Sequence, residues 1–314
     1  STPKPSSAAS DVYKRQIFGD LLAIGFKGDI KMIPAAFDYY RPQNLDGVIS
    51  LLQEHGDDAR VIAGGHSLIP LMKLRMAEVP HLIDLQNITE LFGIDVGSKV
   101  RIGAMVTQSD IINDISLASA APILKEASLQ IADPQVRYMG TVGGNVANGD
   151  PGNDMPGLMQ CLDASFLLQG PDGEREVKAR DFYQGAYMTE REDDEVLVAV
   201  TFDAPKGGYA YEKQKRKIGD YATAAAAVII SRDGSVCKGA SIAMTNLSDT
   251  PVFCTDASNS LVGTSVTADD IKKAVNEMIE AIDPAEDNRG PVEFKKHAAS
   301  VVLTRAIKSA WERA

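Results

Sequence analysis

Cysteine is scarce in this sequence, and so is positive charge. The only cysteines are Cys161, Cys237 and Cys254, which are too few and too scattered for a disulfide framework. They also lack the grouped spacing of four thiolates that an iron–sulfur cluster requires, so we expect a reducing, cytoplasmic compartment. Lysine and arginine number 32 against 43 acidic residues, and the resulting net charge of −11 argues against nucleic-acid binding.

Several site motifs are also missing. No Gly-x-Gly triplet occurs, which excludes the Rossmann fingerprint, and there is no P-loop. No Gly-x-Ser-x-Gly motif supplies a hydrolase nucleophile. The histidines lack the i, i+4 spacing of a zinc site. No apolar run approaches the ~18 residues of a membrane span. We therefore predict no catalytic residues, no metal site and no transmembrane segment.

The rest of the composition is that of a folded protein with more than one domain. The 314 residues, 44% of them hydrophobic, are enough to bury substantial cores. Residues 1–31 begin with a Ser/Pro/Ala-rich stretch, and we expect them to be a non-native or disordered extension that ends before Met32. The segment Pro205-Lys206-Gly207-Gly208 is the strongest boundary signal, which predicts domains at 32–206 and 209–314.

The order of expected elements is mixed, which favours an α+β architecture over a doubly wound sheet. Asn44 is the expected N-cap of a helix that ends at Gly56. Short strands are expected at 59–63, 81–85, 99–104, 164–168 and 195–202, helices at 108–115, 120–131 and 155–162, and a loop at 140–153. Strands at 209–214, 222–231 and 236–246, followed by helices at 268–282 and 292–313, complete the second domain.

Two glycine pairs stand out as candidate anion sites. The first, Gly64-Gly65, follows an expected strand, and successive backbone N–H groups in such a turn can form an anion-binding nest. A tight turn without a ligand explains this pair equally well. The second, Gly143-Gly144, lies in a long stretch rich in glycine and asparagine. Two such turns suggest the two phosphates of one dinucleotide, held by backbone amides because cations are scarce.

Six sequence segments resemble the FAD-binding medium subunits of molybdenum hydroxylases, especially the flavoprotein subunits of aerobic carbon monoxide dehydrogenases. They are FDYYRP (37–42), AGGHSLIPLMKLR (63–75), IGAMVTQ (102–108), IADPQVRYMGTVGGNVANGDPGNDMP (131–156), RDFYQGAY (180–187) and YEKQKRKIGDYATAAAA (211–227). The resemblance runs from about residue 32 to the end. It implies a PCMH-type, vanillyl-alcohol-oxidase-like domain of two α+β subdomains, followed by a smaller C-terminal α+β domain.

The resemblance also implies a set of residues that bind FAD non-covalently. The first turn and its strand would wrap the diphosphate, the second turn would bind it from the other lobe, Asp154 would meet ribityl or ribose hydroxyls, and Lys213 and Tyr221 would lie by the ring system. The implied set is Val61, Ile62, Ala63, Gly64, Gly65, His66, Ser67, Leu68, Ala104, Thr107, Ile131, Thr141, Val142, Gly143, Gly144, Asn145, Asp150, Asp154, Leu197, Lys213 and Tyr221. His66 is ambiguous, because some related oxidases tether flavin covalently through a histidine after Gly-Gly.

The function implied by the resemblance is electron transfer. FAD would accept electrons from a small [2Fe-2S] subunit and pass them to an external acceptor, while a large molybdopterin-binding subunit oxidises the substrate. The implied assembly is a dimer of heterotrimers, with possible peripheral membrane association through the acceptor. Two alternatives stay open: a self-sufficient FAD-dependent oxidoreductase of the same fold, and a non-enzymatic scaffold subunit whose glycine turns bind nothing.

Overall fold

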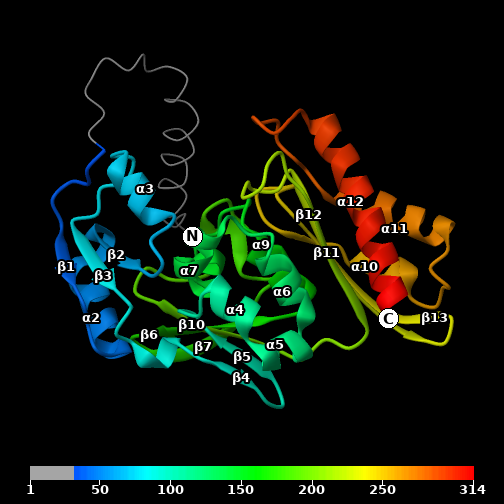
Figure 1. Ribbon diagram of the computed structural model, residues 1–314. Coiled ribbons are helices and arrows are strands. Elements are labelled where there is room, and N and C mark those ends of the chain that lie inside the picture. Colours follow the sequence, from blue (N-terminus) through cyan, green and yellow to red (C-terminus); the bar gives the residue numbers. More distant parts are fainter. Residues whose placement is uncertain (1–31) are drawn as a thin grey trace, which may run out of the picture.

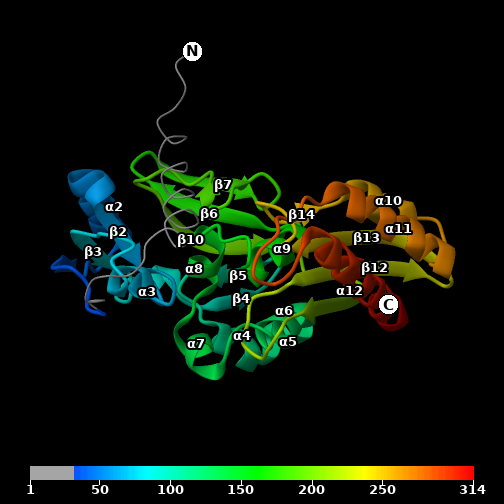
Figure 2. The same ribbon diagram turned by 90° about the horizontal axis from the view of Figure 1, so that it is seen from above.

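The computed structural model describes residues 32–314, which form three lobes, each with its own sheet (Figure 1). The expected extension at 1–31 lies outside the described residues. Figure 2 shows the three sheets following one another along the molecule. The mixed helix and strand content confirms the expected α+β class.

The first lobe is a small parallel sheet with helices at its side. The strands β1 (Asp38–Tyr40), β3 (His81–Asp84) and β2 (Ala59–Ile62) pair in that order. The helices are α2 (Leu45–His55) and α3 (Leu68–Lys73), and the 3-10 turns are η1 (Gly56–Asp58) and η2 (Thr89–Leu91). Asn44 caps α2 as expected, because its side chain accepts a hydrogen bond from the Gly47 N–H.

The second lobe is a five-stranded antiparallel sheet covered by six short helices. Its strands, in spatial order, are β4 (Ile94–Val96), β5 (Val100–Gly103), β10 (Val196–Phe202), β6 (Ser165–Gly170) and β7 (Gly173–Lys178). The helices are α4 (Gln108–Asn113), α5 (Ile115–Ala120), α6 (Pro122–Ser128), α7 (Pro134–Met139), α8 (Val142–Ala147) and α9 (Asp154–Cys161), and β8 (Tyr183–Gly185) pairs with β9 (Met188–Thr189).

Strand β10 joins the first two lobes. Val198 and Ala199 pack into the core shared with α2 and β3, whereas Leu197 and Val200 pack into the core of the second lobe. The pairing with β6 shifts between Leu197 and Ala199. This β-bulge places two successive residues on one face, so the strand serves both cores.

The third lobe is a four-stranded antiparallel sheet between two layers of helices. The strands β11 (Gly208–Gln214), β12 (Ala224–Asp233), β13 (Val236–Thr245) and β14 (Val252–Phe253) pair in chain order. The helices α10 (Thr255–Leu261), α11 (Ala268–Ala281) and α12 (Val292–Arg313) cover one face, and α9 of the second lobe packs on the other. Small residues permit this contact, since a Cβ on Gly157 would collide with the Thr245 hydroxyl.

Two local predictions were wrong. The expected loop at 140–153 contains helix α8, which forms because the Thr141 side chain accepts a hydrogen bond from the Gly144 N–H at 3.0 Å and so caps its first turn. The segment between the helices expected at 108–115 and 120–131 also contains a separate helix, α5. Asp114 caps α5 through the Leu117 N–H at 2.7 Å, and Pro122 begins the next helix.

Candidate functional site: a glycine-lined cradle between the first two lobes

The two glycine turns meet face to face. A Cβ on Gly64 would collide with the Met139 carbonyl oxygen and lie 3.1 Å from the Cα of Gly140. A Cβ on Gly144 would lie 3.9 Å from the Cβ of Ala63. Glycine is therefore required at position 64 for the turns to approach each other, and the structure brings together segments about 80 residues apart in sequence.

The first turn presents a row of free backbone donors. Among residues 32–314, the N–H groups from Gly64 to Leu68 find no hydrogen-bond acceptor. Gly65 has a φ of +74°, a left-handed conformation that glycine adopts without strain. Successive N–H groups around such a residue converge on one side of the chain and form a concave anion site. His66 and Ser67 are exposed at the rim of this turn.

Sequence reasoning predicts free amides in the second turn, but its amides are hydrogen-bonded within the protein. The N–H of Val142 donates to the Val106 carbonyl and that of Gly143 to the Ala104 carbonyl, both at 2.9 Å. The Gly144 N–H bonds the Thr141 hydroxyl oxygen, and the Asn145 N–H bonds the Thr141 carbonyl at 3.1 Å. These glycines serve close packing, since a Cβ on Gly143 would lie 2.5 Å from the Cβ of Ala104. At Gly144 this turn exposes backbone that carries no side chain.

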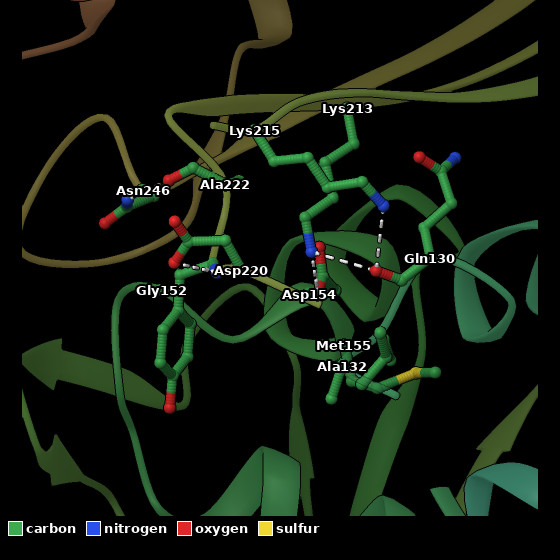
Figure 3. Close-up of polar contacts among 12 residues, drawn as sticks. Gln130, Ala132, Gly152, Asp154, Met155, Lys213, Lys215, Asp220, Ala222 and Asn246 are labelled. Carbon is green, nitrogen blue, oxygen red and sulfur yellow. Dashed lines mark hydrogen bonds and ion pairs between the residues drawn. The ribbon is translucent and has the colours of Figure 1, made fainter. Parts of the chain in front are cut away.

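A buried polar cluster lies where the second and third lobes meet. Asp154, the first residue of α9, is 4% exposed, and its carboxylate accepts hydrogen bonds from the Tyr211 hydroxyl at 2.5 Å and the Lys213 ammonium at 2.8 Å. Figure 3 shows Lys213 and Lys215 converging on the carbonyl of Gln130, at 3.3 and 3.4 Å. Burial and the nearby Asp154 raise the pKa of Tyr211 well above its ordinary value, so its hydroxyl stays protonated.

Three cations surround the carbonyls of residues 130–132. Arg137 donates to the carbonyls of Ile131 and Ala132, at 2.9 and 3.2 Å, beside the two lysines on Gln130. Burial lowers the pKa of Lys215, and the positive charges of Lys213 and Arg137 lower it further. In a chain with a net charge of −11, this is a local excess of positive charge next to a single buried carboxylate.

Tyr221 belongs to a second cluster beside the first. A Cβ on Gly152 would lie 2.8 Å from the Cδ1 of Tyr221, so the tyrosine ring packs on the glycine backbone. Asp150 accepts a hydrogen bond from the Gly152 N–H at 2.9 Å, and the side chains of Tyr187 and Tyr221 lie close enough to its carboxylate to influence its pKa. Burial raises the pKa of Tyr221 to about 12 and also raises the pKa of Asp150.

The remaining predicted residues have packing or capping roles in the structure. Ile131 and Leu197 are buried in the core of the second lobe, and Asn145 accepts from the Met155 N–H at 3.2 Å. Thr107 caps α4 and pairs with Thr141 across an isolated bridge, which aligns the two segments. Val61 and Ile62 belong to β2, the strand that leads into the first turn.

Sequence reasoning missed Tyr211 and Arg137. Tyr211 and Lys213 alternate along β11, so both point to the same face, and this period of two is a signal that could have grouped them. Arg137 has no comparable signal, because it contacts backbone carbonyls of Ile131 and Ala132, and Ala132 adopts a φ of +44° that no sequence pattern indicates.

The chain resembles proteins of one kind over nearly all of the described part. A family model described as the FAD binding domain in molybdopterin dehydrogenase matches residues 35–205. A second, described as the CO dehydrogenase flavoprotein C-terminal domain, matches residues 209–310. Among residues 32–314, no group of three or more His, Cys, Asp or Glu side chains is placed to hold a metal ion. No helix in that part combines the length and hydropathy needed to cross a membrane.

Curated relatives and solved structures agree with these models. The carbon monoxide dehydrogenase medium chain of Afipia carboxidovorans is 54% identical over 287 residues, which cover 90% of this chain and 99% of that one. The corresponding chain of Hydrogenophaga pseudoflava is 43% identical, with 90% and 99% covered. A solved structure of reconstituted CO dehydrogenase from Oligotropha carboxidovorans matches with a TM-score of 0.88 at 53% identity and covers 90% of this chain and 100% of that one.

Proposed function

Because the chain belongs to the family of FAD-binding medium subunits of molybdenum hydroxylases, we propose that it passes electrons through FAD within a carbon monoxide dehydrogenase complex. The chain is an oxidoreductase subunit, and FAD is its cofactor. Electrons would arrive from a [2Fe-2S] subunit and leave to an external acceptor. A molybdopterin-binding subunit would oxidise carbon monoxide, in a cytoplasmic dimer of heterotrimers.

The observation that carries the proposal is the row of amides from Gly64 to Leu68 that have no acceptor within residues 32–314, opposed by the exposed backbone at Gly144. Backbone amides can hold a diphosphate without cations, which suits an acidic chain. The first turn would bind the diphosphate, and the second would close over it without donating. When bound, FAD supplies the capacity to take up and release electrons singly or in pairs.

The polar cluster fits the rest of such a cofactor. Both oxygens of Asp154 already accept a hydrogen bond, but a carboxylate has further lone pairs that can accept sugar hydroxyls. Lys213 holds that carboxylate in place and adds positive charge beside it, which favours an electron-rich ring system nearby. Tyr221 offers an aromatic face at the edge of the same region.

Two observations support the proposed partner subunits: the names of the relatives and the environment of the cysteines in this chain. The printed names of matching relatives include a dehydrogenase medium chain, a dehydrogenase complex subunit and an FAD-subunit. All three cysteines are buried, and burial raises the pKa of Cys161 to about 12, so its thiol stays protonated. An iron–sulfur cluster would therefore belong to another chain.

The first test is Gly64→Ala. The added Cβ would force the two turns apart, so we expect the purified variant to lose most of its FAD, measured as flavin absorbance per chain after gel filtration. Gly97→Ala is the matched control, because a Cβ there would meet only the Lys99 carbonyl at 3.9 Å. A wild-type protein that takes up no FAD, or a Gly64→Ala variant with full flavin content, would contradict the proposal.

A second test separates the relay from a self-sufficient enzyme. The FAD-loaded chain alone should not oxidise carbon monoxide with an artificial acceptor, whereas the complex purified with its iron–sulfur and molybdenum subunits should. Turnover of a small substrate by the isolated chain would favour the self-sufficient oxidoreductase. Acid precipitation should release all of the flavin, because the attachment is non-covalent.

A further inference from the structure

A loop of the third lobe reaches across to Tyr221. The segment between α11 and α12 turns back on itself through backbone hydrogen bonds between Asp287 and Gly290, at 3.3 and 3.1 Å. At its tip, the guanidinium carbon of Arg289 lies 5.6 Å from the centre of the Tyr221 ring. A second contact comes from Arg216, which donates to the Asn288 carbonyl at 3.0 Å and pairs with Asp220, the neighbour of Tyr221.

Arg289 is held by a chain of charges that begins in α12. Lys295 is 3% exposed, and its ammonium contacts the Asp287 carboxylate at 3.0 Å and the Ala285 carbonyl at 2.7 Å. The same carboxylate accepts from the Arg289 N–H at 2.8 Å and from its guanidinium at 3.1 Å. Burial opposes the charge of Asp287, but the Arg289 amide and Lys295 outweigh it and lower the pKa of Asp287.

The placement of Arg289 is not explained by its own hydrogen bonds. Its Nε is buried and has no acceptor among the described residues. The ion pair with Asp287 is only partly buried, with side chains 19% and 23% exposed, so solvent screens it and it contributes little net stability. The positive charge of Arg289 does, however, act on Tyr221 and on the carboxylates of Asp150 and Asp220 beside it. This arrangement makes sense if it fixes where the ring lies.

We propose that Arg289 is a positioning residue that, braced by Asp287 and Lys295, holds the Tyr221 ring against Gly152 at the edge of the FAD site. The third lobe would thereby form one wall of the cofactor site. This inference rests on the proposed function. The wall is built from three lengths of chain: Gly152 before α9, Tyr221 between β11 and β12, and Arg289 before α12. Tyr221 is 43% exposed, and the Arg289 guanidinium contacts its ring in addition to the Gly152 backbone.

The experiment follows the Tyr221 ring directly, with and without cofactor. The full chain is labelled with 3-fluorotyrosine, and the ¹⁹F resonance of residue 221 is assigned by its loss in Tyr221→Phe. In Arg289→Gln we expect this resonance to move and narrow as the ring gains freedom, and Arg289→Lys should restore part of the wild-type line. The visible circular dichroism of the FAD-loaded protein should also change in Arg289→Gln and return part of the way to the wild-type spectrum in Arg289→Lys, because this signal reports the aromatic surroundings of the flavin.

Arg232→Gln is the control, because Arg232 makes a similar contact, 5.1 Å from the Trp311 ring, at the opposite end of β12. It should leave the residue-221 resonance unchanged. An Arg289→Gln resonance identical to the wild type would overturn the proposal. If the wild-type protein takes up no FAD, the proposed function fails, but the ¹⁹F spectra of the cofactor-free protein still decide the role of Arg289. If Arg289→Gln fails to fold, Lys295→Met and Arg289→Lys decide it by the same resonance.

Discussion

Replacing Lys213 with methionine should destabilise the protein strongly, because it leaves a buried carboxylate without its cation. The Lys213 side chain is 1% exposed and that of Asp154 is 5% exposed, with 2.8 Å between the charged atoms. Solvent screens such a pair very little. Removing one partner of a buried pair costs about 3–5 kcal/mol, and methionine preserves most of the apolar volume, so the loss reports the charge. Within the described part of the chain, the Tyr211 hydroxyl then remains as the one side-chain donor to Asp154.

Adding Asp154→Asn to Lys213→Met should recover most of that loss. The double variant carries no charge at this position, and an amide oxygen can still accept from the Tyr211 hydroxyl.

Urea unfolding followed by far-UV circular dichroism measures these differences in the free energy of unfolding. Lys217→Met is the control, because Lys217 is exposed in the same segment, and its effect should stay within about 0.5 kcal/mol. The reasoning would be refuted by single and double variants whose losses simply add, since the two residues would then not form a coupled pair.

Two further predictions concern the same region. Gly143→Ala should cost about 1–3 kcal/mol of stability, because its Cβ would lie 2.5 Å from the Cβ of Ala104. Differential scanning calorimetry should show a lower melting temperature for the variant. An unchanged melting temperature would mean that the turn can relax around the added methyl group. Tyr211→Phe should reduce the loss of stability at alkaline pH. Because the pKa of Tyr211 lies well above its ordinary value in the folded protein, its contribution to stability is fully present below pH ~10 and is lost progressively as the pH rises above that value. In denaturant titrations, variant and wild type should therefore differ at neutral pH and converge as the pH rises above ~10.

The two glycine turns show how far sequence reasoning reaches. Their pairing predicted one dinucleotide cradle, and the contact between Gly64 and Met139 does bring the turns together. The same reasoning assigned free amides to both turns. In the second turn those amides are consumed by Val106, Ala104 and Thr141, partners whose positions depend on how β5 and α4 pack beside α8. Glycine marks a close approach in both places, but sequence alone cannot tell approach to a ligand from approach to another strand.

Local patterns determined the α+β class and the capped helix after Asn44, because turn chemistry and periodicity act over a few residues. The family resemblance supplied the cofactor. Only the tertiary structure decided which charges meet. Asp154 joins Tyr211 and Lys213 from the next lobe, and Arg289 reaches Tyr221 from about 70 residues away. These contacts depend on the packing of whole sheets and helices, and no spacing along the chain encodes that packing.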